Sequence, residues 1–151
     1  EHLFEYKTHM MQNYGAGVQA CYRGPRLYDT PETQAAVTEV IQWYKKYRDI
    51  LNSDMIHLRR PDARDWDGFI HVNPHKKEKG LAMFFNPTHQ EITRTIHIPL
   101  YYTGLTQTAR IREKEQKPVT YKLNRDYTVA VSYTVKIPAN GYTWYVVEAA
   151  D

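Results

Sequence analysis

The hydrophobic period of this 151-residue chain changes once, close to Leu51, and that change limits the folds open to it. Up to Leu51 apolar residues recur at helical spacing, whereas beyond it they alternate in short runs separated by glycine, proline and asparagine. Short alternating runs of this kind are typical of strands. We therefore predict a mainly β fold: an antiparallel β-sandwich of about seven strands, preceded by one or two α-helices and a short strand.

The predicted strands of the sandwich share alternating or continuous apolar patterns that end at turn residues. They lie at about 68–73, 80–86, 91–98, 109–113, 119–123, 127–137 and 142–149. In the sixth, apolar residues from Val129 to Ile137 alternate with small or polar ones, which predicts a strand with one face in water. The first two runs end at Asn73 and Asn86, each followed by a proline that cannot donate to a ladder.

The first third of the chain has a different organisation. Residues 31–51 carry one broad apolar stripe and begin with Pro31, which favours a helix start. Residues 3–14 have the pattern of a helix end, and 18–22 form a short β-compatible run. We predict a helix–strand–helix segment at 1–55 and a C-terminal sandwich at 66–151. A single strand cannot make a sheet, and the chain starts inside a helical pattern, so we interpret it as a fragment of a longer protein or a matured chain.

Composition argues against several classes of protein. The 20 basic and 17 acidic residues give a net charge of +3 and are spread along the chain, without the basic stripe that nucleic-acid binding needs. No apolar run approaches the roughly 20 residues of a membrane span. Cys21 is the only cysteine, which excludes an internal disulfide, and we interpret it as a small core residue. We expect neither nucleic acid nor a membrane span among the partners.

Four phrases of the chain together resemble the C-terminal end of bacterial glycoside hydrolases of the α-galactosidase-like kind. They are YGAGVQACYRGPRLY at 14–28, WYKKYRDIL at 43–51, GLAMFFNP at 80–87 and TWYVVE at 143–148. Enzymes of this kind are built as a (β/α)8 barrel followed by a β-sandwich. The resemblance runs in order over nearly the whole chain, although its individual motifs are loose.

The resemblance implies that residues 1–17 end a late barrel helix, 18–22 form the last barrel strand and 31–51 the last barrel helix. Glycoside hydrolysis needs two carboxyl groups that flank the scissile bond, and these would lie on earlier strands outside this chain. The chain is then the non-catalytic C-terminal portion of the enzyme, its partner is the catalytic barrel, and it is inactive alone. The resemblance also favours a periplasmic or extracellular location, which the residues themselves do not indicate.

The loop after the short strand holds the first group of candidate site residues. In a barrel this edge is where active sites are built, so arginine, tyrosine and aspartate side chains there suit sugar hydroxyls or a carboxylate. The candidate substrate-binding residues are Tyr22, Arg23, Arg26 and Asp29. The alternative is that Arg23 and Asp29 only tie the loop to the start of the following helix.

Aromatic residues in the sandwich form the second group. An aromatic face complements the apolar face of a pyranose ring, which would make the sandwich an independent carbohydrate-binding module. The candidate stacking residues are Trp66, Tyr101, Tyr102 and Trp144, with Tyr142 and Tyr145 as further aromatics. The alternative is that alternating aromatics on strands fill the core or cover the edge of the sheet.

Metal and cofactor sites are not indicated. The acidic loop at 62–67 invites a calcium hypothesis but lacks the twelve-residue EF-hand pattern, and neighbouring arginines favour ion pairs instead. The seven histidines are scattered without zinc-ligand spacing. We therefore expect no catalytic residue, metal or cofactor in this chain. A third possible role is structural, with self-association through the stripe of Val40, Trp43 and Tyr47.

Overall fold

The computed structural model describes residues 2–16, 31–126 and 134–150. Two helices precede the strands: α1 (His2–Gly15) and α2 (Pro31–Leu51). The strands are β1 (Asp54–Arg59), β2 (Asp67–Val72), β3 (Gly80–Phe85), β4 (Ile92–Thr95), β5 (Thr108–Glu113), β6 (Val119–Lys122), β7 (Thr134–Ile137) and β8 (Tyr142–Glu148), with a 3-10 turn, η1 (Tyr101–Thr103), after β4. The prediction of a mainly β chain with antiparallel strands and preceding helices is confirmed. The predicted strand at 18–22 lies outside the described residues.

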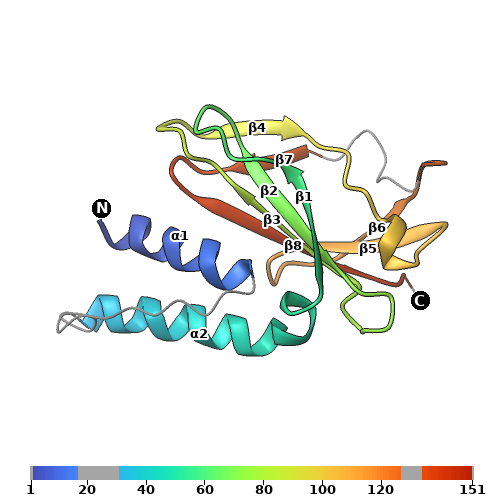
Figure 1. The fold of residues 1–151 in the computed structure, drawn as a ribbon, viewed down its shortest axis with the longest axis horizontal. Coiled ribbons are helices and arrows are strands. Elements are labelled where there is room, and N and C mark those ends of the chain that lie inside the picture. The colour runs from blue at the N-terminus through green and yellow to red at the C-terminus, as the bar shows by residue number, and fades with distance from the viewer. Residues whose placement is uncertain (1, 17–30, 127–133, 151) are drawn as a thin grey trace.

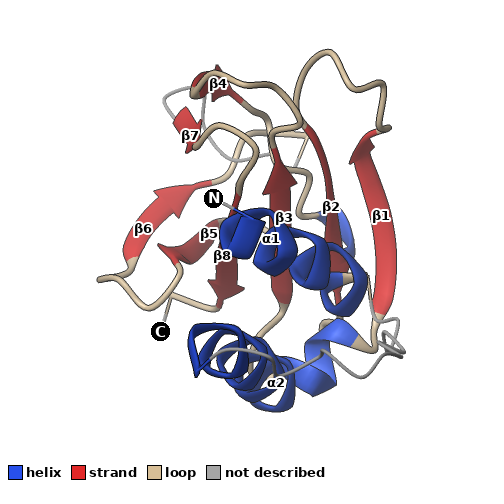
Figure 2. Cartoon of the chain, turned by 90° about the vertical axis from the view of Figure 1, so that its left-hand side faces the viewer, coloured by secondary structure: helices blue, strands red, loops and turns tan. Residues whose placement is uncertain are grey.

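The strands form a six-stranded antiparallel sheet in the order β1-β2-β3-β8-β5-β6 and a two-stranded sheet of β4 and β7. Figure 1 shows α1 and α2 on one side of the large sheet and the β4–β7 pair on the other, and Figure 2 shows the helices in front of the sheet. The described part of the chain is thus layered as helices, large sheet and small sheet. Neither described helix is long and apolar enough to cross a membrane.

The middle strands of the large sheet are buried on both faces because each face is covered by another layer. Every residue of β3 is buried, as are all but one residue of β2 and of β8. Antiparallel strands usually keep one face in water, and the continuous apolar run at Gly80–Phe85 reflects this unusual coverage. By contrast, β7 alternates exposed and buried residues, which confirms the predicted wet face over its described part; residues 127–133 lie outside the described residues.

One strand was not predicted. The residues between the long helix and the acidic loop, for which the sequence predicted no strand, contain β1, which pairs with β2 at the edge of the sheet. Ile56 and Leu58 pack against the core and alternate with Met55 and His57, so the period-two signal is present but only two apolar residues long. The sheet therefore begins at Asp54, before the predicted sandwich start at residue 66, and the acidic loop connects two strands.

Candidate functional site

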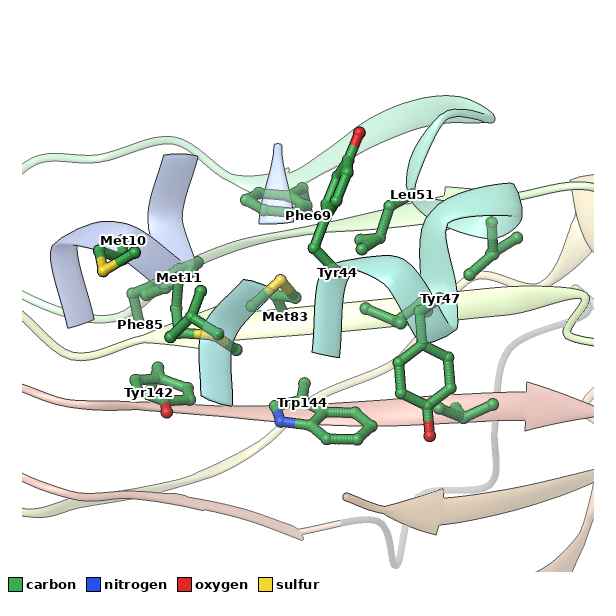
Figure 3. Close-up of a cluster of buried hydrophobic side chains, with 14 of the residues drawn as sticks. Met10, Met11, Tyr44, Tyr47, Leu51, Phe69, Met83, Phe85, Tyr142 and Trp144 are labelled. Atoms are coloured by element: carbon green, nitrogen blue, oxygen red, sulfur yellow. The ribbon is translucent and has the colours of Figure 1, made fainter. Parts of the chain in front are cut away.

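The N-terminal helices and the sandwich share an apolar contact that we call the helix–sheet interface. In Figure 3 side chains from α1 and α2 point onto those of β2, β3 and β8. Its buried members are Met10, Met11, Val37, Val40, Tyr44, Tyr47, Ile50, Leu51, Phe69, Leu81, Met83, Phe85, Tyr142, Trp144 and Val146. Because these side chains are buried, the contact is part of the protein interior. Burying each large apolar side chain contributes roughly 1.5–3 kcal/mol to the stability of the fold.

An aromatic group forms the centre of the helix–sheet interface. The ring of Trp144 on β8 meets Tyr47 edge-on at 5.2 Å between centroids and Trp43 at 5.6 Å. Edge-to-face pairs at this separation add roughly 0.5–1.5 kcal/mol beyond burial. Val40 and Tyr47 are also buried against the sheet, so the apolar stripe of α2 is used within the chain. It is not a free face, which corrects the prediction that this stripe mediates self-association.

A polar cluster closes one edge of the helix–sheet interface. The Tyr47 hydroxyl donates to Glu115, which follows β5 in the β5–β6 turn, and Lys46 pairs with the same carboxylate at 3.0 Å. Arg112 donates to the Tyr47 oxygen at 3.3 Å. Burial, with the Glu115 hydrogen bond, raises the pKa of Tyr47 well above its usual value. Burial acts to raise the pKa of Glu115, but hydrogen bonds from Tyr47 and Lys46 outweigh it and lower that pKa.

Close backbone packing closes the other end of the helix–sheet interface. Gly15, the last residue of α1, lies so near β3 that a Cβ atom there would come within 2.2 Å of the Met83 sulfur. His71 on β2 is buried beside it and contacts the Gly15 carbonyl. His71 is one of the seven scattered histidines, and neither it nor Glu115 stands out in the sequence, because both act on residues more than fifty positions away along the chain.

The four candidate substrate-binding residues lie outside the described residues, so Tyr22, Arg23, Arg26 and Asp29 remain predictions. The four candidate stacking residues do not form one platform. Trp144 is 6% exposed beneath α2, where other rings cover it. Trp66 packs against the opposite face of the sheet, edge-on to Phe84 at 5.7 Å.

Trp66 and the tyrosine pair remain accessible. Trp66 is half-buried beneath the Arg59 guanidinium, and it lines a hollow of about 270 Å³ together with His57, His97 and Pro99. Tyr101 and Tyr102 on η1 are 62% and 63% exposed, with their rings perpendicular and 5.0 Å apart. Tyr142 and Tyr145 are buried, which agrees with the core alternative for these two aromatics.

The acidic loop is held by ion pairs. Arg59 pairs with Asp62 at 2.8 Å, as its proximity in sequence suggested, and Asp65 pairs with Arg94 from β4 at 3.2 Å, a partner that was not predicted. Asp67 is half-buried, and burial raises its pKa to about 6. No group of three or more histidine, cysteine, aspartate or glutamate residues is arranged to hold a metal within the described ranges.

Comparison with known proteins adds information about the fold. No protein-family model matches the sequence, and no curated protein matches it significantly. Among solved structures, a GH27 β-L-arabinopyranosidase from Geobacillus stearothermophilus superposes with a TM-score of 0.62 at 11% identity, over 98% of this chain and 31% of the enzyme. The α-galactosidase I from Mortierella vinacea superposes with a TM-score of 0.62 at 14% identity, over 98% of this chain and 36% of that one.

A further enzyme, with a lower TM-score, shares this fold. An α-amylase from Geobacillus thermoleovorans superposes with a TM-score of 0.50 at 9% identity, over 89% of this chain and 26% of the amylase. In each case the chain spans about a third or less of the enzyme that it matches. The predicted resemblance to α-galactosidase-like glycoside hydrolases is therefore confirmed at the level of the fold: helices and sandwich together have the architecture of one part of a glycoside hydrolase.

Proposed function

We propose that this chain is the non-catalytic C-terminal portion of a glycoside hydrolase, in which the sandwich acts as an accessory domain that stabilises the last helices of the catalytic barrel. The helix–sheet interface carries this proposal. A sandwich that only accompanied a barrel on a linker would contact it through a small polar surface, whereas here three strands and two helices share one buried apolar layer. The similarity in fold to two GH27 enzymes supports the same role.

An activity assay tests the non-catalytic part of this proposal. The chain is incubated with chromogenic α-D-galactopyranoside and β-L-arabinopyranoside, the sugars named for the two similar enzymes. We expect no release of chromophore above the buffer blank. Turnover that purifies with the chain, and that falls when Trp144→Ala loosens the fold, would show that the chain is itself catalytic.

The stabilising part needs the longer protein. Sequencing the coding region before Glu1 tests for preceding strand–helix units, and in that longer protein Trp144→Ala should lower the melting temperature of the barrel as well as that of the sandwich. Trp66→Ala, on the opposite face of the sheet, is the matched control. A barrel that melts at an unchanged temperature in the Trp144 variant would refute the stabilising role.

A second candidate function is glycan binding by the sandwich itself, and the exposed tyrosine pair on η1 favours it. Two tyrosines more than 60% exposed on one short turn are available to stack on sugar rings. A glycan array probed with the chain should then give a saturable signal. The Tyr101→Ala/Tyr102→Ala variant should lose that signal, while Tyr101→Phe/Tyr102→Phe keeps the ring faces and should retain most of it.

A further inference from the structure

The exposed tyrosine pair is held on an ordered turn. Thr103, the last residue of η1, is fully buried, and its hydroxyl donates to the carbonyl of Leu100 at 2.6 Å. Gly104 ends the turn with a φ of 79°, in the left-handed region that favours glycine. The backbone that carries Tyr101 and Tyr102 is therefore anchored in the core, while their rings face outward.

The β2–β3 turn carries a group of cations. Its sequence is PHKKEK, in which three lysines and one glutamate give a formal net charge of +2. The amide of Asn73 donates to the carbonyl of Lys79 at 3.0 Å, and the Lys79 ammonium donates to two carbonyls within the turn at 2.9 and 3.1 Å. These bonds fix the backbone of the turn, and Lys76 and Lys77 are exposed on it.

The two turns contact each other. A Cβ atom at Gly104 would lie 3.1 Å from the Cβ atom of Pro74, and Figure 1 shows both turns at the end of the large sheet where the chain ends. Tyr102 and Lys76 each lie two positions from this contact. Because a residue spans at most about 3.6 Å, the backbones that carry the rings and the ammonium groups lie within about 20 Å of each other. A short oligosaccharide can span that distance.

The two exposed lysines of the β2–β3 turn have no anionic partner in the described part of the chain. Other lysines do pair with carboxylates, among them Lys7 and Lys136. Lys76 borders a hollow together with Asp49 and Asp54, but it forms an ion pair with neither. The ammonium groups of Lys76 and Lys77 are therefore available to an anion from outside the chain.

From these contacts we propose that the tyrosine pair, Lys76 and Lys77 form one binding surface for an acidic oligosaccharide. The rings stack on sugar faces, and the ammonium groups bind carboxylate or sulfate groups on the sugars. The proposal rests on glycan binding as the second candidate function and names its ligand class. A single-stranded nucleic acid also combines charge with stacking, but the basic residues form no stripe that could follow its backbone.

Titration calorimetry with the intact chain tests the preference for acidic ligands. The ligands are a neutral galactan oligosaccharide, an oligogalacturonate and a sulfated galactan oligosaccharide. We expect at least one acidic ligand to bind about tenfold more tightly than the neutral one, with a smaller advantage at high salt. The stronger acidic ligand identifies the anion as carboxylate or sulfate.

The other results of this titration contradict the proposal in distinguishable ways. Equal affinity for neutral and acidic ligands would overturn the acidic preference but leave glycan binding by the sandwich intact. Failure of all three ligands to bind would refute glycan binding as well. Tighter binding of a single-stranded oligonucleotide than of every oligosaccharide would show that the surface serves a nucleic acid instead.

Variants of exposed lysines test whether this surface supplies the charge. Lys76→Gln/Lys77→Gln should remove the preference for the acidic ligand and leave the affinity for the neutral one unchanged. Lys45→Gln/Lys117→Gln is the matched control, because it removes the same charge from exposed positions on α2 and in the β5–β6 turn. If the control lost as much affinity, net charge rather than this surface would attract the ligand, and the proposal would fail.

A tyrosine variant tests whether rings and lysines act on one ligand. Tyr101→Ala/Tyr102→Ala should weaken the acidic and the neutral ligands alike, by about tenfold or more, because both kinds of sugar present a ring face. All four substituted positions of the surface are exposed, so these variants should keep the fold. Full affinity of the tyrosine variant for the acidic ligand would mean that the lysines bind it alone, which would overturn the single surface.

Discussion

The two apolar layers that cover the faces of the large sheet are built from different kinds of side chain. The layer between this sheet and the β4–β7 pair is rich in branched aliphatic residues, many of them from β7 and the segment after β4, among them Ile96, Ile98, Ile111, Val135 and Ile137. The layer between the large sheet and the helices holds the buried methionines and most of the buried aromatic rings. It also carries the buried histidine and the polar cluster around Tyr47.

The difference follows from what each face meets. Two sheets bring rows of strand side chains together, and stiff branched residues fit that regular surface. A helix crossing a sheet leaves irregular gaps, which flexible methionines and edge-to-face rings fill, and its ends expose backbone carbonyls that need donors. The helix face thus has the chemistry of a junction between two structural units, and the strand face that of a domain core.

The largest expected effect comes from deleting the central ring on each face. Trp144→Ala and Phe84→Ala should each destabilise the chain by about 3–5 kcal/mol, measured by urea unfolding. Their local effects should differ: Trp144→Ala should expose the amides of α2 to hydrogen exchange, while Phe84→Ala should expose those of β7. Equal exposure of both layers in both variants would mean that the two faces unfold as one unit.

Adding one methyl group at a glycine should also affect the two sides of the large sheet differently. Gly15→Ala places a Cβ atom 2.2 Å from the Met83 sulfur, and such overpacking costs about 1–3 kcal/mol. Gly80→Ala, where the nearest atom lies at 3.3 Å, should cost less. In a double-mutant cycle the Gly15→Ala penalty should shrink when Met83→Ala makes room. An undiminished penalty would place the strain elsewhere than at Met83.

The elements of this fold could be predicted from the sequence more readily than their contacts. The helix at 31–51 and the strands around Phe69, Leu81 and Trp144 carry strong local patterns, and the structure confirms them. The strand β1 was missed because edge strands pair on one side only and need little apolar surface. The order of the strands in the sheet, with β8 between β3 and β5, cannot be predicted from local sequence patterns.

Contacts between distant residues explain the remaining differences. Trp144 and Tyr101 both look like strand or loop aromatics available to a sugar, yet one is covered by α2 and the other is exposed. Only the placement of the helix decides between them. The same holds for Glu115 and His71, whose partners lie 68 and 56 positions away.

The pH dependence of stability should report on the helix side of the large sheet, because Asp67 lines a hollow there together with Gln12 of α1. Burial raises the pKa of Asp67 from a usual value near 4 to about 6. Between these values the folded chain holds a proton that the unfolded chain has released, so stability should fall as pH rises from about 4 to 6 and then level off. Partial exposure limits the loss to about 1 kcal/mol.

Unfolding measured across that pH range checks this expectation. Asp67→Asn should remove the decline and raise stability at neutral pH by about 1 kcal/mol, whereas Asp54→Asn, at an exposed position on β1, should leave the profile unchanged. If the Asp67→Asn profile still declines between pH 4 and 6, another group is responsible for it.

The smallest effect should come from the polar edge of the helix–sheet interface. Tyr47→Phe keeps the ring against Trp144 but removes the hydroxyl that donates to Glu115 and accepts from Arg112. Because Glu115 is largely exposed and can turn to water, we expect a loss of only about 0.5–1 kcal/mol in urea unfolding. Tyr102→Phe, at a residue that is 63% exposed, should change stability less. If the two variants were equal, apolar packing alone would join the helices to the sheet at this edge, and the polar contrast between the two faces would rest on His71.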